Sequence, residues 1–356
     1  MILKSLKLTS FKNHPDSAFE FSERINCVLG KNGIGKTNLL DAIYYLSFTK
    51  SAVGSQDKLA ITHETQAFTL FGTYDNQTIA LQFEKGKVKT IKIDGQEPER
   101  LSDVIGKAPL VIVLPDDTSM IKEGSDERRK FFDGALSQFD SAYLKALLKY
   151  NKVLKQRNSL LKIEEGRRLN KKLLETYDDQ LIPLAMDISD KRKQMKEVFL
   201  PFLQKNYADL HEGDEVPGLN FKTHVTEEFA DRFKSNSQKD QIMQRTLMGS
   251  HKDDFEFLLD GELIKKFGSQ GQQKTFIIAL KLALYDFLME KTENKPLLLL
   301  DDIFDKLDDS RIQLLVSLLL DNDRFQQIFI TDARKDRSKE LFKGQKEVNF
   351  IELAVK

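Results

Sequence analysis

The chain has 356 residues, of which 40% are hydrophobic, and it carries 55 Lys and Arg against 55 Asp and Glu. This length suggests two domains, and a formal net charge of zero gives no overall argument for a nucleic-acid partner. No apolar run approaches the roughly 18 residues of a membrane span, no signal peptide is apparent, and the single cysteine, Cys27, excludes a disulfide framework, so we expect a cytoplasmic protein without a membrane partner.

A strand-like stretch, ILKSLKLTSF at residues 2–11, opens the chain, and a second short strand is expected at residues 25–29. The second strand runs into the pattern Gly-x-x-x-x-Gly-Lys-Thr and then into apolar residues at helical spacing. Lys36 would contact the β- and γ-phosphates of a bound nucleotide, and Thr37 would offer its hydroxyl to Mg²⁺; the motif alone does not indicate which nucleotide is bound. A glycine-rich turn with a chance lysine is the alternative, which this strand and helix context disfavours. The residues expected to bind the nucleotide are Gly30, Lys31, Asn32, Gly33, Ile34, Gly35, Lys36, Thr37 and Asn38.

Residues 59–93 alternate between apolar and polar side chains, with turn signals at residues 75–76 and near Gly86. This period is typical of strands and predicts an antiparallel β subdomain beside the sheet that carries the P-loop. We therefore expect an α/β fold in which two kinds of sheet contribute to one ATPase lobe.

From Ser141 the apolar residues recur at helical spacing up to Leu161, and they do so again from Leu173 to Met195. Residues 164–170 could turn the chain between the two helices, which predicts a helical hairpin of ordinary length. Residues 142–205 contain 15 Lys and Arg against 8 Asp and Glu. This surplus fits either a solvated helical face or a surface that neutralises DNA phosphates without reading the bases.

Two further short motifs flank this region. Arg128, Arg129 and Lys130 precede the hairpin, and could extend a basic surface. The loop GSHKDDF, residues 249–255, brings a histidine close to two aspartates, but it has no spacing typical of a metal site. We expect a structured loop there and assign no metal to it.

A small polar loop, Ser269, Gln270, Gly271 and Gln272, precedes a long apolar-periodic helix. A loop of this kind at a helix N-terminus is a second candidate anion site. A chain with one phosphate cradle has little use for another on itself, so the loop makes sense if two subunits face each other and each contacts the γ-phosphate of the other. Simple capping of the helix by Ser269 is the alternative.

Four leucines at residues 297–300 predict a buried strand that ends in Asp301 and Asp302. A strand that delivers a carboxylate to its C-terminal edge is how P-loop enzymes hold Mg²⁺. Asp301 is therefore the candidate metal ligand, and Asp302 could orient or deprotonate the attacking water. A buried strand followed by an ordinary acidic turn is the alternative, which the P-loop in the same chain disfavours.

These motifs, in this order, resemble ABC-type ATPases: SQGQ is similar to the signature motif, residues 297–302 to the Walker B strand, and DKLD at residues 305–308 to the D-loop. The opening LKLTSFKNH, residues 6–14, resembles the SMC, Rad50 and RecF group. Within that group the resemblance is to the RecF family, and it spans nearly the whole chain. It is carried by residues 114–133, 150–162, 249–257 and 269–276.

The resemblance implies an ABC-type P-loop ATPase head with a mixed sheet, an antiparallel β subdomain and an inserted mainly helical lobe. We expect residues 1–115 and 290–356 to form the ATPase lobe, and residues 116–289 to form the second lobe. It also implies a weak ATPase that dimerises on ATP and binds single-stranded, double-stranded and gapped DNA. Its implied partners are RecO and RecR, with which it would help load RecA in repair and replication restart.

Three positions depart from the wider superfamily. Asp302 stands where most ABC ATPases carry glutamate, and the shorter acid implies slow hydrolysis. The usual switch histidine is replaced by Thr331 and Asp332, which leaves the γ-phosphate sensor unassigned. Lys12 stands where related proteins often have a basic residue near the nucleotide.

Two other classes of protein carry similar motifs. The nucleotide-binding subunit of a transporter has a much shorter interval between P-loop and signature than the roughly 230 residues found here. A head of the SMC, Rad50 or OLD type coupled to a nuclease is the second alternative. The SMC and Rad50 proteins extend the helical insertion far beyond the hairpin predicted here, and OLD-type enzymes append a nuclease domain.

Overall fold

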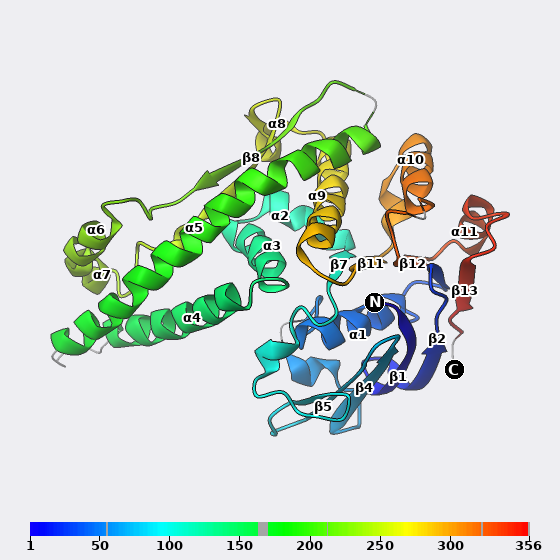
Figure 1. Ribbon diagram of the computed structural model, residues 1–356, viewed down its shortest axis with the longest axis horizontal. Coiled ribbons are helices and arrows are strands. Elements are labelled where there is room, and N and C mark those ends of the chain that lie inside the picture. Colours follow the sequence, from blue (N-terminus) through cyan, green and yellow to red (C-terminus); the bar gives the residue numbers. More distant parts are fainter. Residues whose placement is uncertain (55, 163–169, 212, 322, 355–356) are drawn as a thin grey trace. The chain divides into compact units, whose positions relative to one another are not determined.

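The computed structural model describes residues 1–54, 56–162, 170–211, 213–321 and 323–354. The chain forms two compact units. Each unit is built from separate parts of the sequence, which the colours of Figure 1 distinguish. The first unit contains Met1–Thr118, Lys205–Asp214 and Gln270–Lys356, and the second contains Ser119–Gln204 and Glu215–Ser269.

A five-stranded parallel sheet with the order β13-β3-β12-β11-β7 lies in the first unit. Its strands are β3 (Ile25–Leu29), β7 (Leu110–Val113), β11 (Leu297–Leu300), β12 (Gln327–Asp332) and β13 (Val348–Glu352). Every residue of strands β3, β7, β11 and β12 is buried. A parallel sheet covered on both faces requires such continuous apolar runs, which explains the four consecutive leucines of β11.

An antiparallel sheet with the order β2-β1-β4-β5-β6 completes the β structure described in this unit. Its strands are β1 (Leu3–Phe11), β2 (His14–Glu20), β4 (Ala67–Tyr74), β5 (Thr78–Glu84) and β6 (Thr90–Ile93). Strand β1 alternates between buried and exposed positions, because one face of the sheet packs on the core. The β subdomain predicted from residues 59–93 is thus confirmed, and it also includes the N-terminal strand pair.

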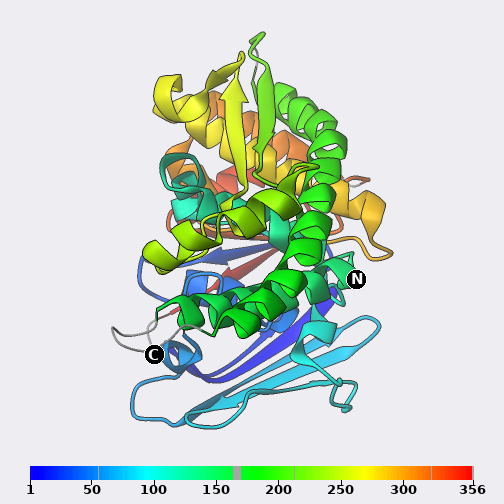
Figure 2. The same cartoon turned by 90° about the vertical axis from the view of Figure 1, so that its left-hand side faces the viewer.

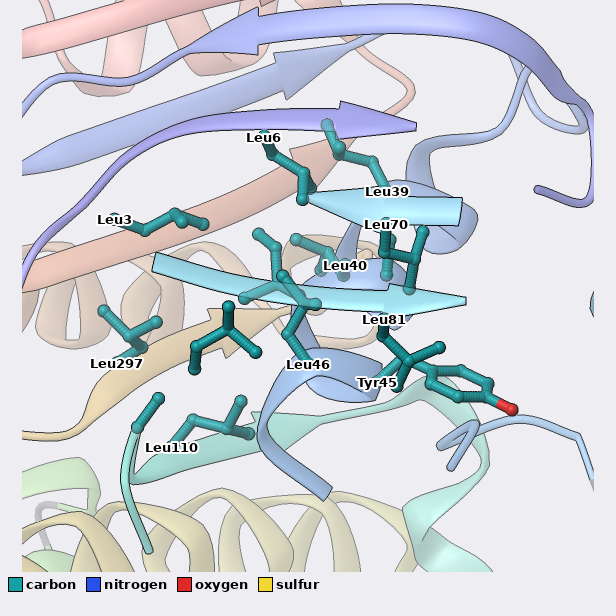
Figure 3. Close-up of a cluster of buried hydrophobic side chains, with 14 of the residues drawn as sticks. Leu3, Leu6, Leu39, Leu40, Tyr45, Leu46, Leu70, Leu81, Leu110 and Leu297 are labelled. Atoms are coloured by element: carbon teal, nitrogen blue, oxygen red, sulfur yellow. The ribbon is translucent and has the colours of Figure 1, made fainter. Parts of the chain in front are cut away.

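Helix α1 (Lys36–Phe48) joins the two sheets through one hydrophobic core (Figure 3). Leu39, Leu40 and Leu46 of this helix pack with Leu6 and Leu70 of the antiparallel sheet. The same cluster includes Leu110 and Leu297 of the parallel sheet, so the P-loop helix is held from both sides. The other helices of this unit are η1 (Asp57–Ala60), η2 (Leu101–Val104), η3 (Pro115–Thr118), α9 (Gln270–Lys291), η5 (Ile303–Lys306), α10 (Asp309–Leu319) and α11 (Lys335–Leu341).

Helix α9 belongs to the first unit by its contacts, whereas the sequence analysis assigned residues 270–289 to the second lobe. The buried Lys281 Nζ explains this placement, because it donates to the Ile112 carbonyl at 2.7 Å and lies 2.9 Å from an Asp117 carboxylate oxygen. These bonds hold α9 beside β7. The functional division into lobes at 115/116 and 289/290 stays a prediction.

The second unit is mainly helical. Helices α4 and α5 lie side by side in both views (Figures 1 and 2), and the N-cap Asp140 begins α4 by accepting a hydrogen bond from the Tyr143 N–H. The bounds are α2 (Ser119–Lys122), α3 (Ser125–Ser137), α4 (Ser141–Leu161), α5 (Lys171–Leu210), α6 (Phe229–Ser235), α7 (Ser237–Ile242), η4 (Ser250–Lys252) and α8 (Ile264–Phe267).

The return helix is longer than its apolar spacing indicated, and residues 205–210 at its end belong to the first unit. The predicted turn at residues 164–170 lies, up to residue 169, outside the described residues. A small antiparallel sheet, β10-β9-β8, also belongs to the second unit and was not predicted. Its strands are β8 (Pro217–Lys222), β9 (Asp254–Leu259) and β10 (Glu262–Leu263).

Two arginines that the sequence analysis counted in the basic surplus are buried in ion pairs. The Arg157 side chain is 0% exposed and lies 2.6 Å from an Asp178 oxygen and 2.7 Å from an Asp240 oxygen. The Arg192 side chain is 2% exposed and binds Asp133 and Asp253. Both guanidinium groups tie separate elements of the unit together, so they are not free to contact DNA.

None of the helices in the described ranges is long and apolar enough to cross a membrane.

The core around α1 generates the first prediction. Leu46 is fully buried in it, whereas Leu59, in the same unit, has 64% of its surface exposed. We expect Leu46→Ala to lower the free energy of unfolding by about 2–5 kcal/mol, because it removes buried methyl groups and leaves a cavity. The matched control Leu59→Ala should change it by less than about 0.5 kcal/mol. Urea unfolding of both variants checks this, and equal losses would contradict the assigned core.

Candidate nucleotide-binding site

The loop between β3 and α1 has the backbone that a phosphate cradle needs. Gly33 and Gly35 have φ angles of 80° and 113°, in the region where side chains are strained. A Cβ atom on Gly35 would also lie 2.6 Å from the Asn13 side chain and 2.8 Å from His14 Nε2. Glycine is therefore required at residue 35 both for its backbone conformation and for the close approach of residues 13 and 14.

Lys36, the first residue of α1, turns its side chain back along the loop. Its Nζ donates to the Gly30 carbonyl at 2.9 Å, to the Lys31 carbonyl at 3.4 Å and to Asn32 Oδ1 at 3.3 Å. Nζ also lies 3.9 Å from Asp302 Oδ1. The side chain is only 4% exposed, so its charge is held inside the loop and beside the acidic end of β11.

Thr37 meets the candidate metal carboxylate directly. Its hydroxyl lies 2.8 Å from Asp301 Oδ2 and 3.1 Å from Oδ1, although 264 positions separate the two residues in the sequence. Strands β3 and β11 are not neighbours in the sheet; β12 lies between them and supplies Thr331. The Thr331 hydroxyl donates to Asp301 Oδ1 at 2.7 Å and accepts from the Asp302 N–H at 2.9 Å. Thr37 at the start of α1 and Thr331 of β12 thus fix the position of the carboxylate that follows β11.

The surroundings of Asp301 and Asp302 raise the pKa of both carboxyl groups. Burial raises the pKa of Asp301, and hydrogen bonds from Thr331 and Thr37 together with the charge of Lys36 only partly offset it. Burial also raises the pKa of Asp302; Lys36 lowers it, while the neighbouring carboxylates, Asp301 first among them, raise it further. Cations that entered here would favour the ionised forms.

Asp302 has an unusual backbone, with φ 45° and ψ 39°. It begins the turn that leads from β11 into η5, and its Oδ1 is buried without a hydrogen-bond partner among the described residues. A buried carboxylate oxygen without a donor is costly unless another group satisfies it. The atom lies on the Lys36 side of the site, where a water or phosphate group could be bound.

Residues 12–14, at the turn from β1 into β2, support the P-loop, a role that the sequence analysis missed. His14 Nε2 is hydrogen-bonded to the Gly35 carbonyl at 3.1 Å, and Asn13 contacts both Gly33 and Asn38. Lys12 Nζ lies 2.7 Å from a carboxylate oxygen of the buried Asp41. The polar run Lys-Asn-His at the end of an apolar strand was the available signal, but it could not indicate which loop the run contacts.

The end of β12, where a switch histidine was missing, carries a second polar cluster. Asp332 is buried and accepts hydrogen bonds from Arg337 at 2.6 Å and from Ser338 at 2.5 Å. Burial would raise its pKa, but the Arg337 and Ser338 hydrogen bonds outweigh this and lower it. Arg337 also binds Asp305 of the predicted D-loop at 2.7 Å. Asp332 thus anchors an arginine that connects β12 to the D-loop.

The predicted signature loop lies at the start of α9. Ser269 and Gln270 are exposed, and Gln270 is the first residue of the 22-residue helix. A Cβ atom on Gly271 would lie 3.2 Å from an Arg311 guanidinium nitrogen, and that guanidinium is bound to Asp308 at 2.7 Å. The glycine therefore leaves room for a side chain from α10, which starts just after the D-loop.

The structure brings Lys36, Thr37, Asp301 and Asp302 into one cluster within the first unit, while Ser269–Gln272 present an exposed helix start. Their roles in binding ATP and Mg²⁺ stay predictions. Among the residues described, no three His, Cys, Asp or Glu side chains form a group that could hold a metal.

Comparison with known proteins defines the family. Residues 2–350 match the model of the RecF/RecN/SMC N-terminal domain. The DNA replication and repair protein RecF of Cytophaga hutchinsonii is 42% identical over 349 residues, which cover 97% of this chain and 92% of that protein. The protein of the same name from Flavobacterium johnsoniae is 40% identical over 350 residues, covering 97% of each.

Solved structures give the same result for the fold. The recombination mediator protein RecF-ATPrS in the RecFOR pathway matches with a TM-score of 0.86 and 30% identity, over 99% of this chain and 96% of that chain. An SMC head bound to the C-terminal winged-helix domain of ScpA matches with a TM-score of 0.55 and 16% identity, over 94% of this chain and 90% of that one, which shows the fold alone. The predicted α/β ABC-type head is confirmed, and the chain belongs to the RecF family of DNA replication and repair proteins.

Proposed function

We propose that this chain is an ATP-dependent DNA-binding recombination mediator whose P-loop site binds ATP with Mg²⁺. The observation that carries the proposal is the contact between Thr37 Oγ1 and Asp301, 2.8 Å apart. A P-loop hydroxyl and a carboxylate at the end of a buried strand are the two protein ligands that hold Mg²⁺ in P-loop ATPases. The related RecF-ATP structure, 32% identical, supports the choice of nucleotide.

The residues of the site suit this chemistry. Thr37 and Asp301 would hold Mg²⁺, which would supply positive charge against the phosphates of ATP. Lys36 would exchange its loop carbonyl partners for phosphate oxygens, and the loop N–H groups would bind the phosphates from the other side. Asp302 would orient the attacking water, and its short side chain would make hydrolysis slow. Slow hydrolysis fits a switch that controls dimerisation and DNA binding rather than a high-turnover enzyme.

Ser269 and the first residues of α9, Gln270 to Gln272, would complete the site of a second copy. The N-terminus of α9 attracts anions. Each ATP would then lie between the P-loop of one subunit and the loop of the other. Binding energy from both phosphate sites would thus drive formation of an ATP-dependent homodimer.

In this proposal the closed dimer binds single- and double-stranded DNA and their gap junctions in the cytoplasm. RecO and RecR would act with it to load RecA, as expected from the recombination mediator role named for the related structures in the RecFOR pathway. Exposed lysines would contact backbone phosphates, so binding should depend on salt and hardly on sequence. Hydrolysis would open the dimer and release the DNA.

Two variants separate ATP binding from dimerisation. Lys36→Ala removes the cation of the P-loop and should lose both ATP binding and ATP-induced dimers. Ser269→Arg places a bulky cation at the exposed loop and should still bind ATP as a monomer. Nucleotide titration and sedimentation with ATP and with ADP measure the two properties. Normal dimers of the Ser269 variant would show that the loop has no role across the subunits.

Asp302 allows the chemical step to be tested alone. Asp302→Asn keeps the size of the side chain but removes its basic oxygen, so we expect ATP hydrolysis to fall by about 10²-fold or more. ATP-induced dimers should persist and dissociate more slowly, because hydrolysis no longer opens them. Steady-state hydrolysis and DNA release after removal of free ATP are the measurements. Unchanged hydrolysis would exclude Asp302 as the residue that positions the water.

Asp301 links the site to stability. Because burial raises its pKa, the folded protein binds this proton more tightly than the unfolded chain, and the stability it contributes is lost as pH rises through the raised pKa. At pH 7, Asp301→Asn should therefore raise the melting temperature of the nucleotide-free protein. The same variant should lose the extra stability that Mg²⁺ and ATP give. Thermal unfolding with and without Mg²⁺ and ATP tests both, and a less stable free variant would contradict the assignment.

A further inference from the structure

Two motifs that the nucleotide site does not use meet in the second unit. The run Arg128, Arg129 and Lys130 lies on α3, and Lys252 to Asp254 lie at the junction of η4 and β9. Arg129 Nη1 donates to the Asp253 carbonyl at 2.6 Å, and Arg128 binds the Asp254 carboxylate through Nε at 2.8 Å and Nη2 at 3.0 Å. Motifs separated by more than a hundred residues therefore form one structure.

A cavity of about 550 Å³ opens where they meet. This volume is within the range of small-ligand sites in proteins. Its lining includes Ser125, Arg129, Asp133, Tyr150, Arg192 and Lys252. Helices α3, α4 and α5 and the η4 segment all contribute, so the cavity is a built feature of the unit rather than a gap along one helix.

The cations of the cavity differ in how they are neutralised. Arg192 is paired with Asp133 and Asp253, so both acids are already used. Arg129 is 11% exposed, but the carboxylate it contacts, Asp126, is 78% exposed and thus strongly screened by water. Lys252 is exposed, and no ion pair to it exists among the residues that the structure describes. Two positive charges at the cavity are therefore weakly compensated.

The cations also repel one another. Burial lowers the pKa of Arg129, and Arg192 lowers it further, against the opposing effect of Asp133, Asp253 and Asp254. Burial likewise lowers the pKa of Lys252, and the charges of Arg245 and Arg129 add to this. An anion bound between Arg129 and Lys252 would relieve this repulsion. Ser125 Oγ accepts from Arg129 at 2.5 Å, which leaves its hydroxyl proton available to the same anion.

We propose that this cavity binds a backbone phosphate of DNA through Arg129, Lys252 and Ser125. The proposal rests on the proposed DNA-binding function and locates a contact for it. DNA is favoured over a free phosphate because α4, which lines the cavity with Leu147, Tyr150 and Asn151, also carries a series of exposed lysines. A polyanion that reached beyond the cavity could contact these: Lys145, Lys149, Lys152 and Lys155.

Lys252→Ala tests the site with little risk to folding, because its side chain is exposed. The full-length protein with ATP is titrated into a fluorescent duplex at several salt concentrations. Loss of one phosphate contact should reduce the slope of log K against log salt by about 0.9. If the variant and the unsubstituted protein bind DNA equally at 1 M salt, this change of slope makes the variant bind about eightfold more weakly at 0.1 M salt. ATP binding and ATP-induced dimers should not change.

Lys222→Ala is the matched control. Lys222 is also an exposed lysine of the second unit, and it lines a neighbouring cavity that Lys252 borders as well. Binding as tight as in the unsubstituted protein is expected for this control. Equal weakening by both variants would assign the effect to the neighbouring cavity or to general charge, and would overturn the proposal.

Arg129 gives a second, independent readout. Arg129→Gln should weaken DNA binding and reduce the salt slope, whereas Arg129→Lys keeps the charge and should restore most of the slope. Thermal unfolding identifies any loss of folding, and the rescue by lysine is an effect that a purely structural role would not produce. If both variants and Lys252→Ala bind DNA as the unsubstituted protein does, the cavity is not a DNA contact.

Titration with inorganic phosphate distinguishes the sources of the anion. Weak phosphate binding that is lost in Lys252→Ala, together with weaker DNA binding, supports the proposal. Phosphate binding by the cavity with unchanged DNA affinity in the variants would assign it to a small phosphate ligand and overturn the proposal. If the unsubstituted protein binds no DNA with ATP at any salt concentration, the proposed function itself fails, which is a different result from failure of this site alone.

Discussion

The contact between Thr37 and Asp301 is the constraint on which the rest of the first unit depends. It requires the ends of β3 and β11 to meet across β12, so the parallel register of three strands must be correct at once. Thr331, in the strand between them, fixes the carboxylate and the following backbone N–H. The hydrophobic core on both sides of α1 keeps the P-loop in the same frame. An aligned set of polar groups is thus held by apolar packing around it.

The second unit has a different arrangement of charges. Its buried arginines are neutralised by aspartates from other elements, and they act as internal links rather than as a surface for a partner. The cations left weakly compensated gather at the cavity lined by Arg129 and Lys252. Although the net charge of the chain is zero, some of its cations are neutralised inside the fold and others remain available to bind an anion.

The sequence predicted the elements with strong local signals and missed those that depend on distant contacts. The P-loop, the strand ending in Asp301 and the antiparallel sheet follow from glycine placement and apolar periodicity. The support of the loop by Asn13 and His14 did not, since nothing local indicates which loop a polar turn will contact. The basic surplus of residues 142–205 was overestimated as a surface, because Arg157 and Arg192 are buried by acids far away in the chain. Helix α9 was grouped by sequence position, whereas Lys281 ties it to β7.

The backbone conformation of Asp302 limits which residues suit the turn after β11. Its dihedral angles fall in the left-handed helical region, which aspartate and asparagine tolerate far better than residues with longer side chains. Aspartate therefore suits this turn, and its short side chain holds the carboxylate close to the main chain. If Asp302 positions the attacking water, as proposed, the torsion angles of this one residue would help to set how long a bound ATP persists.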